Sequence, residues 1–353
     1  MKKNYSVLSL FSGCGGLDLG FKGGFSFLGK LYAPLNFNVV WANDILKDAC
    51  LTYKKNLNHD IVCADINKVL YPENFLINPN TPLPEEVDIV LGGFPCQDFS
   101  LAGKRRGFNN TTRGLLYKSM CKVIKRTKPI LFVAENVKGL LSMDRGEALK
   151  TIIKDFSDLG YSVDPHLYLA ADYGVPQMRE RVLIVGTRKD KLPVFKAPSP
   201  ATPKPSWVNV KEAIEDLENV LEGDVINHYW SKAKTNKGQG NNAISPDKPG
   251  PTMRAEHHGN IEYHWNRKRR LSAREAARIQ SFPDNFIFYP STSSAYKQIG
   301  NAVPPVLAWH VAKAIQEFLD ENLNINLDTS INNDIYTKSF SHGGRLSYSL
   351  KSD

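Results

Sequence analysis

Short apolar runs alternate with stretches of mixed polarity over the first half of the chain. Five runs are rich in aliphatic residues and are flanked by Gly, Asp or Asn, as strand ends in an open α/β sheet usually are. They predict buried strands at Val7–Phe11, Asn38–Ala42, Val87–Leu91, Ile130–Ala134 and Val182–Gly186. The alternation predicts a Rossmann-like α/β fold, whose doubly wound, mostly parallel sheet binds ligands at the carboxyl ends of its strands.

Helical spacing is clearest in Glu147–Leu159, which is followed by Gly160, a residue typical of a C-cap. The pattern changes near Lys189, where five prolines fall close together and mark a boundary. From there to about Asn266 the chain is irregular and rich in Gly, Asn, His and Lys. These features predict a second, less regular segment after the sheet.

The last part of the chain predicts helices again. Ser272–Glu275 fits a capping box that opens a helix running towards Ser281, and Pro305–Phe318 predicts another helix. The tail beyond about Asn322 is polar and rich in Ser and Asn, so we expect it to be poorly ordered.

Composition and charge restrict the class of protein. A length of 353 residues suggests two domains, or one large domain with an insertion. The 45 Lys and Arg against 36 Asp and Glu give a net charge of +9, which is compatible with a polyanionic partner without requiring one. No apolar stretch approaches the ~18 residues of a membrane span, and no secretory signal is visible. The five scattered cysteines form no CxxC pair, which disfavours disulfides and structural zinc and indicates a cytoplasmic protein.

A glycine-rich turn, Phe11–Gly20, follows the first predicted strand. Its glycines let the backbone turn sharply and approach a ligand, with helix N–H groups available. A nucleotide site also needs an acid at a following strand end to hold a ribose, and Asp44 fits that role. Asp65 fits a second contact, for example to an adenine amino group. A tight turn with two solvated acids explains the same residues, and both interpretations stay open at this point.

A cysteine follows the third predicted strand in a loop shaped by Gly and Pro. In Gly92–Ser100, Cys96 lies where a strand end presents a nucleophile, and nearby positive charge favours the reactive thiolate. The basic run Lys104-Arg105-Arg106, flanked by glycines, suits closure over an anionic substrate. A buried structural cysteine beside a solvated basic run is the alternative.

Six motifs, in one order, resemble the cytosine-5 DNA methyltransferases, a family that uses S-adenosylmethionine. They are Phe11–Gly16, Gly93–Gln97, Glu135–Val137, Gln177–Arg181, Arg270–Phe286 and Gln298–Pro304. The resemblance implies an enzyme with the class I methyltransferase fold, a DNA (cytosine-5-)-methyltransferase of the bacterial restriction–modification type. It also implies a monomer in the bacterial cytoplasm, associated with the nucleoid, that protects host DNA from a partner restriction endonuclease.

The resemblance assigns four catalytic residues: Cys96, Glu135, Arg179 and Arg181. The Cys96 thiolate adds to carbon 6 of cytosine and so activates carbon 5 towards the methyl group. Glu135 contacts or protonates ring nitrogen 3, for which burial must raise its pKa. Arg179 and Arg181 alternate, so on extended backbone both face one side, where they orient the carboxylate, the base and a phosphate. Taken alone, the acid suits a helix start and the arginines a strand-edge salt-bridge pair.

For the cofactor, the resemblance implies contacts from the glycine turn, two strand ends and a loop near the C-terminus. The residues expected to bind S-adenosylmethionine or S-adenosylhomocysteine are Phe11, Ser12, Gly13, Gly15, Gly16, Leu17, Asp44, Ile45, Asp65, Ile66, Asn301 and Val303. No metal is expected. The family often has Glu and an aromatic residue where Asp44-Ile45 stands, and Gly20–Asn38 is expanded without an assigned role.

The partner implied is double-stranded DNA, from which the target base must be extruded. Lysine and arginine contacts to phosphates position such a protein, and groove contacts read the sequence. The residues expected to contact DNA are Gln97, Ser100, Lys104, Arg105, Arg106, Thr252, Arg254, His257, Arg267 and Arg269. Adjacent His257 and His258 are not expected to chelate a metal.

The resemblance also divides the chain. We expect a discontinuous catalytic domain at 1–188 plus 290–325, a target-recognition domain at 189–268, a hinge at 269–289 and a polar tail at 326–353. Three other functions are alternatives to a DNA methyltransferase: a cytosine-5 methyltransferase acting on RNA, a nicotinamide-dependent oxidoreductase, and a catalytically silent DNA-binding relative. The oxidoreductase leaves Cys96, Glu135 and the arginine pair without a joint explanation, and the intact motifs argue against the silent relative.

Overall fold

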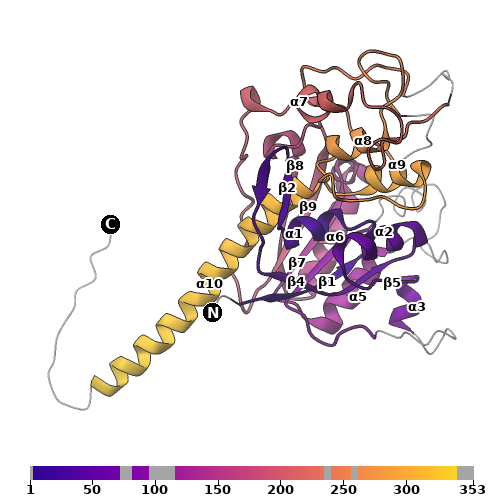
Figure 1. The fold of residues 1–353 in the computed structure, drawn as a ribbon. Helices are drawn as coiled ribbons and strands as arrows, with labels where there is room; N and C mark the ends of the chain where they lie inside the picture. The colour runs from indigo at the N-terminus through magenta and orange to yellow at the C-terminus, as the bar shows by residue number, and fades with distance from the viewer. Residues whose placement is uncertain (1–2, 72–81, 95–115, 234–239, 256–260, 340–353) are drawn as a thin grey trace.

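The computed structural model describes residues 3–71, 82–94, 116–233, 240–255 and 261–339, and only the backbone of 324–339. A seven-stranded sheet lies at its centre, in the order β5-β4-β1-β6-β7-β9-β8 (Figure 1). The strands are β1 (Tyr5–Leu10), β4 (Phe37–Asp44), β5 (Val62–Cys63), β6 (Ile89–Gly93), β7 (Leu131–Val137), β8 (Tyr161–Leu169) and β9 (Glu180–Arg188). All five predicted strands are confirmed, with ends displaced by a few residues.

The sheet is mostly parallel, as predicted. β1 pairs in parallel with β4 and β6, and β6 pairs in parallel with β7. β9 runs antiparallel to both β7 and β8, so β9 alone is reversed and the edge strand β8 runs in the same direction as β7. This reversal brings the start of β9 beside the carboxyl end of β7.

Helices cover both faces of the sheet (Figure 1). The helices of the described part are α1 (Gly16–Lys22), α2 (Lys47–Leu57), α3 (Ile66–Leu70), α5 (Leu116–Thr127), α6 (Glu147–Asp158), α7 (Val210–Ile214), α8 (Ala273–Ile279), α9 (Thr292–Asn301) and α10 (Pro305–Ser339), of which α7, α8 and α9 lie together beyond the sheet. Short 3-10 turns occur at Lys138–Leu141, Met143–Gly146, Ala170–Tyr173, Lys204–Ser206 and Glu215–Leu217. Within the described residues, no helix is both long and apolar enough to cross a membrane.

Local sequence signals explain where α6 ends and where α8 begins. α6 ends before Gly160, which has a φ of +96° and donates its N–H to Ser157 O, as expected of a C-cap. α8 opens with the predicted capping box, in which Ser272 Oγ accepts from Glu275 N and the Glu275 carboxylate accepts from Ser272 N. Both predicted signals, the glycine after α6 and the capping box of α8, are confirmed.

The helix predicted at Pro305–Phe318 is confirmed, and it continues beyond its predicted end. α10 continues to Ser339 and extends away from the rest of the molecule, whereas poor order was expected beyond about Asn322 (Figure 1). Low apolar content did not stop the helix because no Gly or Pro interrupts the chain between Val306 and Ser339. The last residues, 340–353, lie outside the described part.

The core forms two apolar layers, one on each face of the sheet. Neighbouring strand residues point to opposite faces, so Val7 and Ile89 belong to one layer while Leu8 and Val90 belong to the other. α1 and α10 cover the first layer, and α5 and α6 cover the second. The sheet is thereby buried on both faces, which leaves its carboxyl edge as the place for chemistry.

The expanded stretch Gly20–Asn38 forms a small antiparallel hairpin of β2 (Phe25–Phe27) and β3 (Lys30–Tyr32). Tyr32 stacks on Phe25 with ring centroids 5.1 Å apart and meets the Trp309 ring of α10 edge-on at 5.2 Å. Trp309 Nε1 also donates to Ala33 O at 2.8 Å. The hairpin therefore anchors α10 on the sheet domain.

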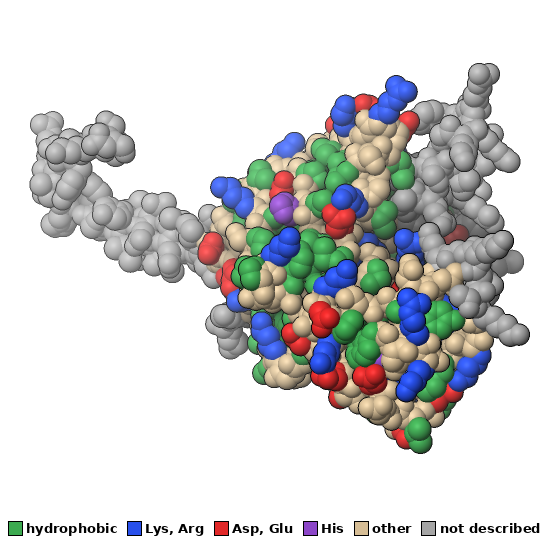
Figure 2. Space-filling model, turned by 90° about the horizontal axis from the view of Figure 1, so that it is seen from above, with side chains coloured by type: hydrophobic (Ala, Val, Ile, Leu, Met, Phe, Trp, Pro, Cys, Tyr) green, Lys and Arg blue, Asp and Glu red, His purple; other side chains and the backbone are tan. Residues whose placement is uncertain are grey.

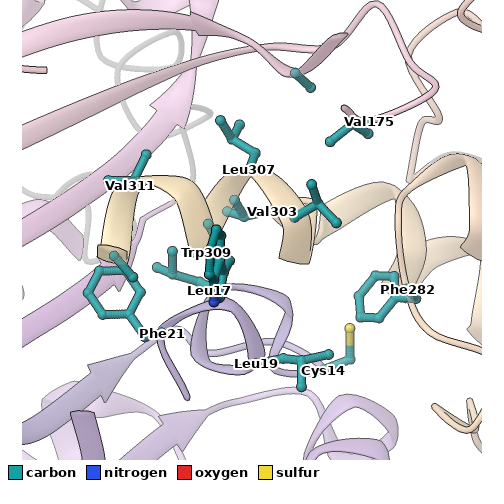
Figure 3. Close-up of a cluster of buried hydrophobic side chains, with 14 of the residues drawn as sticks. Cys14, Leu17, Leu19, Phe21, Val175, Phe282, Val303, Leu307, Trp309 and Val311 are labelled. Carbon is teal, nitrogen blue, oxygen red and sulfur yellow. The ribbon is translucent and has the colours of Figure 1, made fainter. Parts of the chain in front are cut away.

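α1 and α10 approach each other closely, and the Trp309 side chain of α10 points toward α1 beside Leu17 (Figure 3). A Cβ on Gly20 would lie 2.3 Å from Ala308 Cβ and 2.7 Å from Pro305 O. Gly20→Ala is therefore expected to lower the free energy of unfolding by about 1–3 kcal/mol in a urea titration.

Gly139→Ala is the matched control for this prediction. Its added Cβ would meet no atom nearer than 3.8 Å, so its stability should stay close to that of the wild type. If Gly20→Ala were as stable as Gly139→Ala, the close packing of α1 against α10 would be wrong.

Candidate active site

The site begins where β6 and β7 end side by side. Gly93 pairs with Glu135 across this part of the sheet. A Cβ on Gly93 would lie only 3.1 Å from Glu135 Oε2, so glycine leaves room for that carboxylate. Asn136 Nδ2 donates to Phe94 O at 2.9 Å and holds the first residue of the following loop against β7.

The predicted nucleophile belongs to this loop. Cys96 lies outside the described residues, as do Gln97, Ser100, Lys104, Arg105, Arg106 and His257. The chain reaches Phe94, two residues before Cys96, beside the Glu135 strand. The cysteine loop therefore starts beside Glu135, the acid expected to act with Cys96.

Glu135 forms a buried ion pair with Arg181. Arg181 Nε lies 2.8 Å from Glu135 Oε1, and both side chains are about one-tenth exposed. Burial raises the pKa of Glu135, whereas the positive charges of Arg181 and Arg179 oppose that rise. The pair is thus an acid of raised pKa held in one orientation, which suits the donation of a hydrogen bond or proton at a defined place.

Arg179 faces a different direction from Arg181. It is fully buried, and its guanidinium donates to Met253 O at 2.8 Å, Gly300 O at 2.7 Å and Ala302 O at 3.0 Å. Arg179 therefore binds backbone carbonyls, whereas Arg181 is the arginine that pairs with the Glu135 carboxylate. Arg179 precedes β9, which begins at Glu180, so the alternation of an extended strand does not apply to it.

The glycine turn and the first strand-end acid lie together, as predicted. Gly13 N donates to Asp44 Oδ2 and Leu46 N to Asp44 Oδ1, both at 2.8 Å. Gly13 and Gly15 have φ values of +57° and +93°, and no atom lies within 4 Å of a Cβ built on Gly13. Burial raises the pKa of Asp44, and the backbone N–H bonds oppose the rise. An acid beside an open, glycine-lined turn fits the ribose and methionine parts of S-adenosylmethionine.

The far side of the turn is closed by the loop after α9. A Cβ on Gly16 would lie 2.4 Å from Val303 O, so glycine is required for this approach. Asn301, the last residue of α9, is exposed beside this contact. The return of the C-terminal segment to the glycine turn agrees with the expected closure of the site.

The remaining predicted cofactor residues fall into three groups. Phe11, Ser12 and the exposed Ile45 lie at strand ends around the turn. The side chain of Leu17 is instead buried in the first apolar layer (Figure 3), and that of Ile66 is buried in the second. Asp65 Oδ1 caps α3 by accepting from Asn67 N at 2.9 Å.

The structure divides the expected DNA contacts into exposed residues and residues with partners inside the protein. Thr252 Oγ1 donates to Met178 O at 3.1 Å, and Arg254 and Arg267 are exposed. Arg269 instead forms two 2.7 Å hydrogen bonds to the Glu275 carboxylate, and its side chain is only 8% exposed. The basic run before α8 is therefore partly internal, because the acid of the capping box binds one of its arginines.

Surface charge follows no single patch on the face that Figure 2 shows, where Lys and Arg are interspersed with Asp and Glu. No group of three or more His, Cys, Asp or Glu among the described residues is arranged to hold a metal ion.

Two buried glutamines, Gln177 and Gln280, lie inside the quoted motifs, although the sequence predicted no role for either. What sets them apart is visible only in the structure, where both polar side chains are fully buried.

The chain is similar to known proteins over most of its length. Residues 5–245 and 227–317 match the family model described as C-5 cytosine-specific DNA methylase. The chain is 38% identical to the Type II methyltransferase M.NgoFVII of Neisseria gonorrhoeae, over 90% of this chain and 87% of that protein. It is 37% identical to M.FnuDI of Fusobacterium nucleatum, over 90% and 96%. A prophage-encoded protein of E. coli, 24% identical, has the same fold with a TM-score of 0.65, covering 90% of this chain and 99% of that one.

Proposed function

The chain belongs to the C-5 cytosine-specific DNA methylase family, and from this membership we propose how its site works. It is a DNA (cytosine-5-)-methyltransferase of a Type II restriction–modification system. We propose that it methylates carbon 5 of cytosine within a specific double-stranded sequence, with S-adenosylmethionine as the donor. The observation that carries the proposal is the buried Glu135–Arg181 pair beside the β6 end that leads to Cys96.

In this proposal the chain's own residues activate the base. The Cys96 thiolate adds to carbon 6 of an extruded cytosine and makes carbon 5 nucleophilic. Glu135 donates to ring nitrogen 3 and offsets the negative charge that builds up on the ring, while Arg181 holds the carboxyl in place. S-adenosylmethionine, when bound, supplies an electrophilic methyl group. Loss of the carbon 5 proton then lets the ring expel the thiolate.

Asp44 and the glycine turn are proposed to hold the cofactor. Asp44→Asn keeps the side chain's shape but removes its charge, so one of its acceptor positions becomes a donor. We expect the variant to bind S-adenosylhomocysteine roughly 10–100-fold more weakly in calorimetry, because hydrogen bonds to charged groups contribute about 1.5–3 kcal/mol.

Asp60→Asn is the control, since Asp60 is an exposed acid paired only with Lys54 at 2.7 Å among the contacts described for it. Its affinity for S-adenosylhomocysteine should match that of the wild type. An Asp44→Asn variant that bound as tightly as Asp60→Asn would remove Asp44 from the cofactor site.

Methyl incorporation tests the function as a whole. With a tritiated donor, label should enter duplex DNA and not transfer RNA, and bisulfite sequencing of DNA from cells expressing the protein should show 5-methylcytosine at one sequence. Label in RNA alone would favour the RNA methyltransferase.

We further propose that the enzyme is a cytoplasmic monomer, and that methylated DNA resists the partner endonuclease.

A further inference from the structure

Three fully buried polar side chains form a cluster that the methylation chemistry does not use. Gln177, Arg179 and Gln280 have essentially no exposed surface. Gln177 Nε2 donates to Gln280 Oε1 at 2.6 Å and to Ile279 O at 3.0 Å. We call these three side chains the polar hub.

One side of the hub binds the segment Gly250–Met253. Gly250 N donates to Pro176 O at 3.0 Å and Met178 N donates to Gly250 O at 2.7 Å, so the two backbones pair directly. Met253 N then donates to Gln177 Oε1 at 2.9 Å, and Met253 O accepts from Arg179 at 2.8 Å. This segment carries Thr252 and leads to Arg254, two of the proposed DNA contacts.

The other side of the hub binds the loop that closes the cofactor turn. Gln280 Nε2 donates to Ala302 O at 2.6 Å, and Arg179 donates to Gly300 O and Ala302 O. Gly300 also lies directly against the Arg254 backbone, where a Cβ would be 2.2 Å from Arg254 C. The hub therefore joins the DNA-facing segment to the cofactor-facing loop.

The chemistry of the hub indicates that it fixes the relative positions of the chain segments that it binds. A buried cation and two buried amides are costly to desolvate, and an apolar cluster of similar volume would pack at lower cost. Both Nη atoms of Arg179 bond to backbone carbonyls, and these bonds fix the relative positions of three chain segments. Arg181 follows Arg179 by two residues, so any shift of these segments is passed to the Glu135–Arg181 pair.

We propose that Arg179 and Gln280 are positioning residues for methyl transfer, which hold the Gly250–Met253 segment and the Gly300–Ala302 loop in register with the Glu135–Arg181 pair. The inference rests on the proposed function. It assigns Arg179 a role through other groups, without contact to the base or to DNA phosphates.

Gln280→Met tests the proposal through the rate of chemistry. The substitution keeps the length of the side chain but removes its bonds to Gln177 and Ala302. With duplex carrying the site found by bisulfite sequencing, the single-turnover rate should fall at least tenfold while the affinity for S-adenosylhomocysteine changes less than threefold. Gln280→Asn, which is too short to span both partners, replaces it if the methionine variant does not fold.

Gln298→Met is the matched control. Gln298 is also buried, and its side chain donates to Tyr289 O at 2.6 Å and Ser294 Oγ at 3.0 Å, neither of which belongs to the Gly250–Met253 segment. It should lose similar thermal stability yet keep its rate within threefold. Equal rates for the Gln280 and Gln298 variants would overturn the proposal, whereas a wild type that does not methylate DNA would instead overturn the proposed function.

Salt dependence separates positioning from a direct phosphate contact. A lost phosphate contact lowers the slope of log affinity against log salt by about one. Arg179→Gln should leave the slope for duplex binding unchanged while slowing single-turnover methylation at least tenfold. The exposed Arg267, changed in the same way, should lower the slope. A lowered slope for Arg179→Gln would make Arg179 a DNA contact and overturn the proposal.

Discussion

Cys96→Ala is expected to lower the rate of methyl transfer at least about 10³-fold while leaving the affinity for S-adenosylhomocysteine nearly unchanged. Carbon 5 of cytosine is a poor nucleophile until a thiolate adds at carbon 6, so no other side chain replaces this step. The measurement is tritiated methyl incorporation at saturating DNA and cofactor, with calorimetry for cofactor binding. Both numbers are needed because a misfolded variant would lose both properties.

Cys121→Ala is the control for this variant. Cys121 is a partly buried thiol on α5, within the layer opposite α1 and α10, and burial raises the pKa of its thiol to about 12. An unreactive thiol of this kind should be dispensable for turnover. Turnover by Cys96→Ala comparable to that of Cys121→Ala would refute the assignment of the nucleophile.

Glu135→Gln is expected to slow single-turnover methylation by about 10²–10⁴-fold, the usual contribution of a positioned acid. The amide cannot transfer a proton to ring nitrogen 3, and it removes the charge that pairs with Arg181. The measurement is the single-turnover rate on duplex carrying the methylation site.

The pH dependence of that rate gives a second, independent readout. Burial raises the pKa of Glu135, so the protonated donor persists to higher pH than for an ordinary carboxyl and is lost as the pH rises through the raised pKa. The wild-type rate should therefore fall with rising pH, and the Glu135→Gln rate should lack this fall.

Glu180→Gln is the matched control for Glu135→Gln. Glu180 is a partly exposed acid on β9 that binds Lys138 Nζ at 2.8 Å. Its loss should leave both the rate and the pH profile unchanged. An unaltered pH profile in Glu135→Gln would show that another group supplies the proton.

The strands could be predicted where burial on both faces produces a continuous apolar run. β8 was missed because Tyr161–Leu169 contains Asp164, Pro165 and His166 and is only half-buried at the sheet edge. The two-residue β5 and the hairpin of β2 and β3 are too short to show a period. The first part of α10 was predicted at Pro305–Phe318, whereas its polar continuation to Ser339 was not.

Candidate site residues could be named from the sequence, but their pairings could not. Glu135 and Arg181 lie 46 positions apart, and they meet only because β9 runs antiparallel to β7. Arg179 could not be oriented from alternation, because its partners are carbonyls of Met253, Gly300 and Ala302 in distant segments. Long-range hydrogen bonds of this kind leave no periodic signal in a sequence.

The most direct test of the central claim is a covalent trap. A duplex carrying 5-fluorocytosine at the methylated position keeps the ring joined to the enzyme after methyl transfer, because fluorine cannot leave carbon 5 as the proton does. The account predicts a one-to-one adduct in the presence of S-adenosylmethionine, with peptide mapping placing the methylated base on Cys96. Normal methylation of the unmodified duplex with no such adduct, or an adduct on another residue, would contradict the account.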